Sequence, residues 1–282
     1  MLNITPHIRS IVEMAVTEDL GHGDITTDSL IPQSLQGTAS IVSRSTGVVS
    51  GVAVAVEVFR IMDPSITVEA IIMDGISIEN GSEIARINGS IAGILKGERL
   101  ALNFLQRLSG IATQTSRYVA AITGTGARII DTRKTTPGLR ELEKYSIRTG
   151  GGHSHRFNLS DGILIKDNHI AVLKSHGMTL RDIIGLAQER APHPLRVEVE
   201  VETVDEAKEA LTAGVDAILL DNMTPDQMRE VVRLSAGKSI LEASGGINLD
   251  TVRAIADTGV DLISVGALTH SVRSLDLSLE ID

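Results

Sequence analysis

The sequence predicts an α/β fold, an incomplete (β/α) barrel that follows an N-terminal α/β region. In the C-terminal half, short runs rich in Val, Ile and Leu alternate with amphipathic segments at intervals of about 20 residues. This spacing is typical of strand–helix units that build parallel sheets and barrels. Six such runs are present, whereas a complete barrel of this kind has eight strands. We therefore expect a barrel that is smaller or less regular than a full one.

Residues 1–112 have a different pattern and are expected to form a separate N-terminal domain. The expected elements are a helix around Pro6–Val16, a strand near Gly37–Arg44, a helix over Gly51–Met62 and a strand near Thr67–Met73. Apolar side chains recur on one face of Gly97–Ala121, which predicts a long amphipathic helix. This helix leads into the barrel domain, residues 113–267.

The barrel strands are short and β-branched. They are predicted at Arg128–Asp131, Ile163–Lys166, Val197–Val201, Ala217–Asp221, Ser239–Ala243 and Leu262–Val265. Three helices between them have recognisable start signals. Thr203 and Thr224 are each followed three residues later by Glu or Gln, the spacing of a capping box, and Asn248 precedes the third helix.

The composition excludes several classes of protein. The chain has no Cys, which excludes disulfides, thiolate metal sites and a cysteine nucleophile. Aromatic residues make up 2% and the net charge is -10, so we expect neither nucleic acid nor a membrane surface as a partner. No apolar stretch approaches the ~18–20 residues of a membrane span, and the first residues carry charges where a signal peptide needs an apolar core. A cytoplasmic location is expected.

The charge balance reverses in one segment. Residues 128–174 hold nine Lys or Arg and five Asp or Glu, so this segment carries +4 while the rest of the chain carries -14. A cationic site within an acidic protein suits a small, highly anionic ligand better than a polymer.

Polar or glycine residues follow every predicted barrel strand, at the end where barrels hold their active sites. These residues are Thr132 to Thr135, Lys166 to His169, Glu200, Asp221 and Asn222, Ser244 to Gly246, and Gly266 and Ala267. Polar strand ends are ordinary in single loops, but all six strands share the feature. We therefore place the site at this end of the barrel.

Glycines follow the last two strands, in ASGGIN and VGALTH. Their backbone N–H groups can approach an anion closely, and barrels often bind phosphate after their last two strands. The sequence therefore predicts phosphate binding there. No GxxxxGK[ST] loop is present, so the phosphates are not held as in nucleoside triphosphatases.

The alternation VEVEVE at residues 197–202 places Val on one face of a strand and Glu on the other. A strand between two strand–helix units has no exposed face, so a Glu there needs a cation, a hydroxyl-bearing ligand or a metal. Glu200, with Asp221 on the next strand, is the preferred candidate. Both are predicted to meet ribose hydroxyls or a magnesium ion.

Two basic pairs, Arg133 with Lys134 and His155 with Arg156, follow segments that resemble turns. The second pair comes after three consecutive glycines, which permit a tight backbone path. Arg grips a carboxylate with two parallel hydrogen bonds, and Lys serves phosphate as a point charge.

Several motifs resemble those of the quinolinate phosphoribosyltransferases. They are EDLGHGDITTDSLIP (18–32), GERLALNFLQRLSGIAT (97–113), DTRKTTPGLR (131–140), GGGHSHRFNLSD (150–161), LIKDNHI (164–170), EVEVET (198–203), LLDNM (219–223), ASGGIN (243–248) and VGALTHS (265–271). The matches run in order through nearly the whole chain. Ser154 is a departure, since the family pattern has Asn before the His-Arg pair.

The resemblance implies an N-terminal α/β sandwich that the C-terminal tail, residues 268–282, rejoins. It implies transfer of phosphoribosyl from 5-phosphoribosyl 1-diphosphate (PRPP) to quinolinate with decarboxylation, using magnesium with PRPP and no organic cofactor. It also implies a homodimer, or a larger assembly, in which each site takes Arg99 from the neighbouring subunit.

Site residues also follow from the resemblance. Those implied to hold quinolinate are Arg99, Arg133, His155 and Arg156. Those implied to surround the ribose 5-phosphate are Ser244, Gly245, Gly246, Gly266 and His270. Lys134 and Lys166 would lie between quinolinate and the phosphates, and Glu200 and Asp221 would complete the catalytic set.

Two alternatives stay open on the sequence alone. Lys166 at a strand end also fits a barrel lyase that forms a Schiff base. A divergent paralogue of the same fold could act on another anion, although the complete set of basic residues argues against it.

Overall fold

The computed structural model describes residues 2–282, which divide into two compact units. Unit 1 comprises residues up to 116, residues 135–151 and residues 268–282, and unit 2 comprises residues 117–134 and 152–267. The segment 135–151 thus clusters with unit 1, although it lies within the predicted barrel domain. The boundary after residue 112 stays a prediction.

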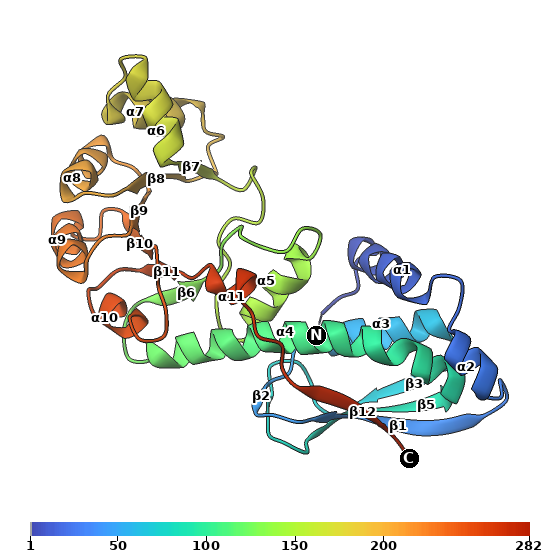
Figure 1. Cartoon of the computed structure of the whole chain (residues 1–282). Coiled ribbons are helices and arrows are strands. Elements are labelled where there is room, and N and C mark those ends of the chain that lie inside the picture. The colour runs from blue at the N-terminus through green and yellow to red at the C-terminus, as the bar shows by residue number, and fades with distance from the viewer. Residues whose placement is uncertain (1) are drawn as a thin grey trace. The chain divides into compact units, whose positions relative to one another are not determined.

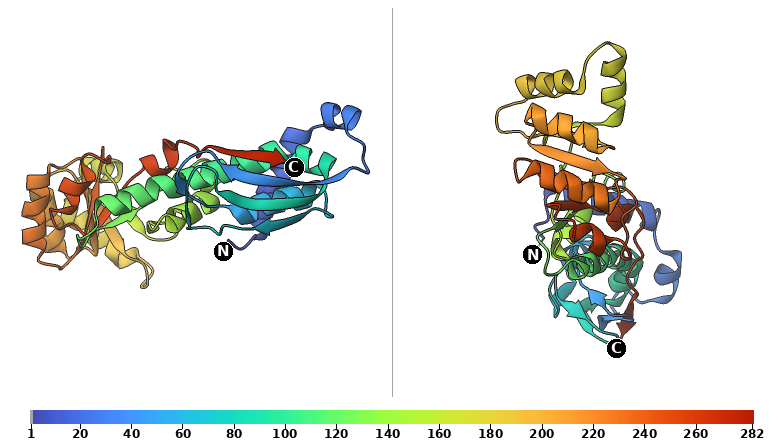
Figure 2. Two further views of the ribbon diagram at one scale, coloured as in Figure 1. Left: turned by 90° about the horizontal axis from the view of Figure 1, so that it is seen from below. Right: turned by 90° about the vertical axis from the view of Figure 1, so that its left-hand side faces the viewer.

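Unit 1 is built on a four-stranded antiparallel sheet of order β12-β1-β5-β3 (Figure 1). Its strands are β1 (Gln36–Ser43), β3 (Thr67–Ala70), β5 (Glu83–Ser90) and β12 (Leu277–Ile281), and β2 (Gly47–Val48) pairs with β4 (Ser77–Ile78). Its helices are α1 (Pro6–Leu20), α2 (Ile25–Leu30), α3 (Val52–Met62), α5 (Arg140–Thr149) and most of α4 (Ile91–Ala121). Figure 2 shows the sheet from two further sides.

Unit 2 contains six parallel strands in the order β6-β11-β10-β9-β8-β7. They are β6 (Arg128–Ile130), β7 (Ile163–Ile165), β8 (Val197–Val201), β9 (Ala217–Asp221), β10 (Ile240–Ser244) and β11 (Leu262–Ser264). The helices are α6 (Asp167–Ser175), α7 (Leu180–Arg190), α8 (Val204–Ala213), α9 (Pro225–Ser235) and α10 (Val252–Ala256), with α11 (Ala267–His270) at the unit boundary. The predicted incomplete α/β barrel is confirmed, and its helices lie outside the strands (Figure 1).

Local sequence explains where the barrel helices begin. Thr203 and Thr224 each cap their helix by accepting a hydrogen bond from the backbone N–H three residues on. The third predicted start is shifted, because Asn248 accepts N–H groups of the turn before α10, which begins only at Val252.

Other elements differ from the sequence predictions in extent. The long helix α4 begins at Ile91, six residues before the expected Gly97, because Ala92 and Ile94 continue its buried face. The strands β5 and β12 and the helix α5 were not predicted, since their patterns of apolar residues are too short or too irregular to stand out. No described helix has the length and apolarity that crossing a bilayer requires.

The two edge strands of the barrel sheet, β6 and β7, do not pair with each other. The chain after Gly152 runs beside β6 instead: His153 donates its N–H to the Ile129 carbonyl, and its own carbonyl accepts the N–H of Asp131. Buried backbone groups need such partners. The segment 152–162 therefore takes the place of a strand next to β6, and it carries the predicted His155–Arg156 pair.

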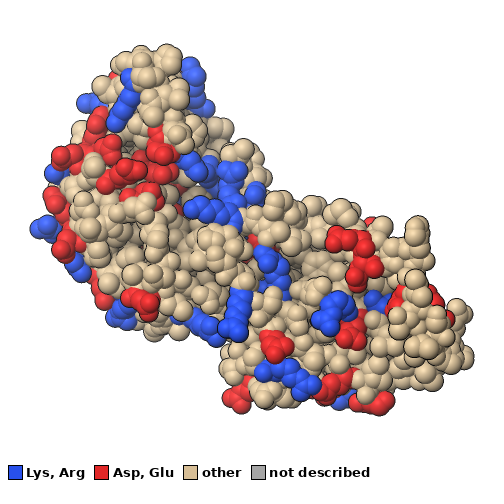
Figure 3. Space-filling model, in the orientation of Figure 1, with Lys and Arg blue, Asp and Glu red and all other residues tan. Residues whose placement is uncertain are grey.

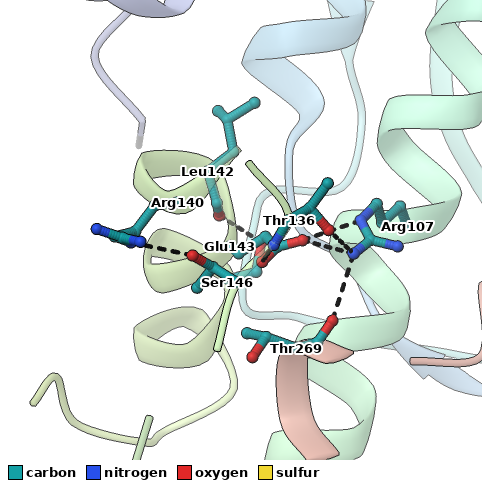
Figure 4. A network of polar contacts seen from close by, with 8 residues as sticks. Arg107, Thr136, Arg140, Leu142, Glu143, Ser146 and Thr269 are labelled. Carbon is teal, nitrogen blue, oxygen red and sulfur yellow. Dashed lines mark hydrogen bonds and ion pairs between the residues drawn. The ribbon is translucent and has the colours of Figure 1, made fainter. Parts of the chain in front are cut away.

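A buried ion pair connects α4 and α5 within unit 1 (Figure 4). Glu143 is 0% exposed, and its carboxylate accepts hydrogen bonds from Arg107 Nε and Nη2 at 3.1 and 2.5 Å and from the Thr136 N–H at 3.1 Å. Arg107 Nη2 also donates to Thr136 Oγ1 and to the Thr269 carbonyl. One guanidinium thus joins α4, α5 and α11.

Replacing Arg107 by Met is expected to lower the free energy of unfolding by about 3 kcal/mol, because it leaves a buried carboxylate without its cation. Urea denaturation monitored by circular dichroism measures the loss. Lys208→Met is the control, since its partners Asp205 and Glu230 are exposed, and it should cost less than about 1 kcal/mol. Equal losses in both variants would contradict the role of the buried pair.

Candidate active site

A cavity of about 400 Å³ lies at the carboxyl ends of the barrel strands. It is lined by Thr132, Arg133, Lys134, His155, Arg156, Leu164, Lys166, Glu200, Leu219, Asp221, Glu242, Ser244 and Ser264. Eight of the predicted site residues are among them: Arg133, Lys134, His155, Arg156, Lys166, Glu200, Asp221 and Ser244. The fold thus brings together residues that lie as much as 111 positions apart in the sequence.

One side of the cavity is basic. Arg156 is held by a hydrogen bond from Nη1 to the Gly162 carbonyl at 3.1 Å, and its pKa is lowered by burial and by the charge of Arg133. The Lys134 N–H donates to Thr132 Oγ1 at 3.0 Å, which shapes the turn after β6. Two guanidinium groups that repel each other gain stability from a shared anion. This side therefore suits a ligand with carboxylate or phosphate groups.

The other side is acidic. The pKa of Glu200 is raised, first by burial and then by the negative charges of Asp221 and Asp167. Asn222 donates from Nδ2 to Asp221 Oδ2 at 2.8 Å and has a left-handed backbone, with φ of 52°. In the part of Figure 3 that holds unit 2, Lys and Arg side chains gather beside Asp and Glu side chains.

The acidic side fits a magnesium ion by its chemistry. Glu200 and Asp221 offer carboxylate oxygens, the ligands that magnesium prefers. The repulsion that raises the pKa of Glu200 would be relieved by a cation between them.

A third group of titratable residues adjoins the cavity, and two of its members, His155 and Glu242, line it. His155 Nε2 is 3.3 Å from Glu198 Oε2 and 3.4 Å from Glu242 Oε2. Burial lowers the pKa of His155, but the hydrogen bond to Glu198 and the charges of Glu242 and Glu198 outweigh it, so the pKa is raised. The backbone N–H of His155 donates to Asp131 Oδ1 at 2.8 Å, which fixes this residue to the end of β6.

Five predicted site residues are not among the described residues that line this cavity: Arg99, Gly245, Gly246, Gly266 and His270. Arg99 and His270 belong to unit 1. Arg99 is on α4, its side chain is 63% exposed, and it lines a different cavity with Asp19 and Lys96. The sequence-based roles of all thirteen predicted residues stay predictions.

The two glycines after β10 differ in their surroundings. A Cβ at Gly245 would clash with the Asn222 side chain, and φ there is +94°. A Cβ at Gly246 would meet nothing within 4 Å, although φ is +59°. Gly245 is therefore required by the protein itself, whereas the space at Gly246 is open to a ligand.

Sequence reasoning missed Glu198 and Glu242. Both are buried, at 9% and 1% exposure, and both point into the barrel from β8 and β10. The argument that selected Glu200 applies equally to Glu242, an acid within the apolar run SILEA. An acidic residue inside a strand covered on both faces was the signal.

The proteins that this chain is similar to belong to the family whose motifs it carries. The family model for the quinolinate phosphoribosyl transferase N-terminal domain matches residues 24–109, and that for the C-terminal domain matches residues 111–280. A Bacillus subtilis protein named probable nicotinate-nucleotide pyrophosphorylase (carboxylating) is 43% identical, over 97% of this chain and 93% of its own. A mitochondrial quinolinate phosphoribosyltransferase (decarboxylating) of Nicotiana glauca is 37% identical, over 99% of this chain and 83% of its own.

A solved structure, that of NadC from Streptococcus pyogenes, matches with a TM-score of 0.93 and 41% identity, over 100% of both chains. Fold and cavity together define an α/β-barrel protein with basic and acidic side chains gathered at the carboxyl ends of its strands. The chain belongs to the quinolinate phosphoribosyltransferase family.

Replacing Asp221 by Asn is expected to lower the pKa of Glu200, because it removes the charge that raises this pKa most after burial. A carboxyl whose pKa is raised on folding is less ionised in the folded than in the unfolded chain, so its contribution to stability falls as pH rises above the ordinary value of 4.5. In the Asp221→Asn variant, the contribution of Glu200 to stability should fall less as pH rises. Titration of the Glu200 side-chain carbonyl by ¹³C NMR measures the pKa directly.

Asp226→Asn is the control for this titration, since the Asp226 side chain is 93% exposed on α9. A pKa of Glu200 that is the same in the Asp221→Asn variant as in the unaltered protein would contradict the coupling.

Proposed function

We propose that the protein transfers phosphoribosyl from PRPP to quinolinate and decarboxylates the product, giving nicotinate mononucleotide, diphosphate and carbon dioxide. The observation that supports this most directly is the cavity with basic residues on one side and Glu200 and Asp221 on the other. Both substrates are strongly anionic, and the ribose becomes cationic as diphosphate leaves. This reaction is a step of de novo NAD biosynthesis.

The basic side binds and orients the pyridine dicarboxylate. Arg133 and Arg156 pair with the carboxylates, and Lys134 and Lys166 neutralise charge between quinolinate and the phosphates. Glu200 and Asp221 hold the ribose hydroxyls and stabilise positive charge at the anomeric carbon. They would also hold the magnesium ion that accompanies the diphosphate, where it neutralises the leaving group.

The bonds change in two steps. The ring nitrogen of quinolinate forms a bond to the anomeric carbon, and the bond from that carbon to the diphosphate oxygen breaks with its electron pair on diphosphate. The bond between the ring and the adjacent carboxylate then breaks, and its electron pair stays on the ring carbon next to the positive nitrogen. Carbon dioxide leaves, and a proton from water completes nicotinate mononucleotide.

The remaining roles are proposals from the resemblance. Ser244, Gly245, Gly246, Gly266 and His270 would bind the ribose 5-phosphate, and His155 would contribute to the quinolinate subsite. A homodimer with Arg99 of the neighbouring subunit in each site, and a cytoplasmic location, also remain predictions. The Schiff-base alternative has less support, because Lys166 is exposed and nucleophilic lysines of that kind are desolvated.

The function is tested by incubation with quinolinate, PRPP and Mg²⁺, with diphosphate and carbon dioxide as readouts. Arg133→Ala is expected to raise KM for quinolinate by about tenfold to a hundredfold, because it removes a charge-assisted partner of ~1.5–3 kcal/mol. Nicotinic acid lacks the second carboxylate and should be a poor substrate of the unaltered protein.

Arg229→Ala, at an exposed arginine on α9, is the control and should leave KM for quinolinate and kcat unchanged. Use of nicotinic acid at the rate found for quinolinate would show that the assignment of the basic residues is wrong. Release of neither product would refute the proposed function.

The shared site predicts complementation between two inactive chains. Arg99→Ala and Lys166→Ala chains, mixed and allowed to exchange into dimers, should recover about a quarter of the sites, since half the dimers are mixed and each has one intact site. Activity is measured after exchange is confirmed by native mass spectrometry. A site built within one chain would recover none, because every chain carries one substitution.

A further inference from the structure

Glu242 and Glu198 enter the barrel interior from two strands that are separated by β9. Between them stands His155, which the segment 152–162 carries in from the gap beside β6. One ring nitrogen of His155 and one carboxylate oxygen of each Glu lie within 4.8 Å of one another. We call these three residues the buried triad.

The hydrogen bonds of His155 determine which ring nitrogen carries the proton. Nδ1 accepts the backbone N–H of Arg156 at 2.6 Å, which requires that Nδ1 carries no hydrogen while the ring is neutral. A neutral imidazole then has its proton on Nε2, which faces the two carboxylates. Nε2 is therefore a donor here and is unsuited to bind a metal ion, although the residue types of the triad would allow one.

Burial keeps the Glu242 carboxyl group, with its raised pKa, largely protonated at pH 7. The pKa of Glu242 is raised to about 8, by burial first and then by the charge of Glu198, against the opposing effects of His155 and Ser264. The charged or polar groups that face Glu242 are Glu198 from β8, His155 and Arg156 from the segment 152–162, and Ser264 from β11. Two ionised carboxylates in this position would repel each other strongly.

Two members of the triad, His155 and Glu242, lie with Arg156 between two cavities. A second cavity, of about 610 Å³, is lined by Arg128, Ile163, Ala217, Ile240 and Leu262, which are the first residues of five barrel strands. His155, Arg156 and Glu242 line both cavities. The wall between them thus consists of the basic pair and the acid beneath it.

We propose that Glu242 is a positioning residue for the anion site: with Glu198 it accepts the Nε2–H of His155, and it thereby holds Arg156 at the wall of the cavity. The inference rests on the proposed function. It gives His155 a second task beside its proposed place in the quinolinate subsite, since both ring nitrogens have partners within unit 2. His155 helps to fix Arg156, to which it is joined along the chain and through Nδ1.

Two variants of nearly equal size test the positioning. Glu242→Met removes the hydrogen-bonding oxygens, and Glu242→Gln keeps an acceptor for His155 and a donor for Glu198. The Met variant should raise KM for quinolinate by about tenfold or more and change kcat less, whereas the Gln variant should stay within about threefold of the unaltered protein at pH 7. Glu230→Gln, at an exposed Glu of α9, is the matched control.

A thermal melt gives a readout that does not depend on activity. Glu242 is less ionised in the folded than in the unfolded chain between pH 4.5 and about 8, so its contribution to stability falls as pH rises through this range. Gln cannot titrate. The Tm of Glu242→Gln minus that of the unaltered protein should therefore increase from pH 5 to pH 8, while the Glu230→Gln difference should stay constant.

The outcomes separate the inference from the proposed function. An unaltered protein without activity on quinolinate and PRPP refutes the function. An active protein whose Met variant keeps its KM overturns the positioning role alone. Equal losses in the Met and Gln variants would show that Glu242 acts as a charge and not through its hydrogen bonds, and would also overturn it. Should the Met variant not fold, a Glu242→Gln variant whose KM for quinolinate rises by more than about tenfold at pH 7 overturns the positioning role.

Discussion

The open edge of the barrel sheet is the constraint on which the site depends. In a closed barrel the first and last strands of the sheet pair with each other. Here those strands are β6 and β7, and they do not pair. The backbone of His153 satisfies the groups next to β6, so the chain enters the barrel at this gap. The following residues, His155 and Arg156, reach the interior because a strand is missing there. Incompleteness of the barrel is thus what provides room for the cationic side of the cavity.

Charge in the barrel interior is arranged in layers. Arg133 and Arg156 face the cavity, and the carboxylates of Glu198 and Glu242 lie beneath them. Buried cations without counter-charges would be costly, and a fully paired set would have no attraction left for a ligand. Because the pKa of Glu242 is raised to about 8, this carboxyl is mainly neutral at pH 7, which leaves the arginines partly compensated. The arrangement allows a dianionic substrate to complete the neutralisation.

Much of the fold and of the candidate site could be predicted from the sequence. The features that could not be predicted were missed for physical reasons. The parallel strands were found within one or two residues, because covered strands are continuous apolar runs. The strand-end rule identified Arg133, Lys166 and Asp221, all of which line the cavity. Glu242 was missed, because a single acid within an apolar run shows its importance only when its neighbours across the sheet are known. Strand β12 could not be paired from sequence, since its partner β1 lies more than two hundred residues away.

That last pairing has a consequence for how the protein is made. Strand β1 bonds to β5 on one side and to β12 on the other, and all of unit 2 is synthesised between β5 and β12. While a ribosome extends the chain, one edge of β1 has no partner, and such edges invite pairing with other chains. The residues of unit 2 are complete before β12 emerges. Assembly of the N-terminal sheet therefore begins early and finishes last, and the interval between is when this chain is most exposed to misassociation.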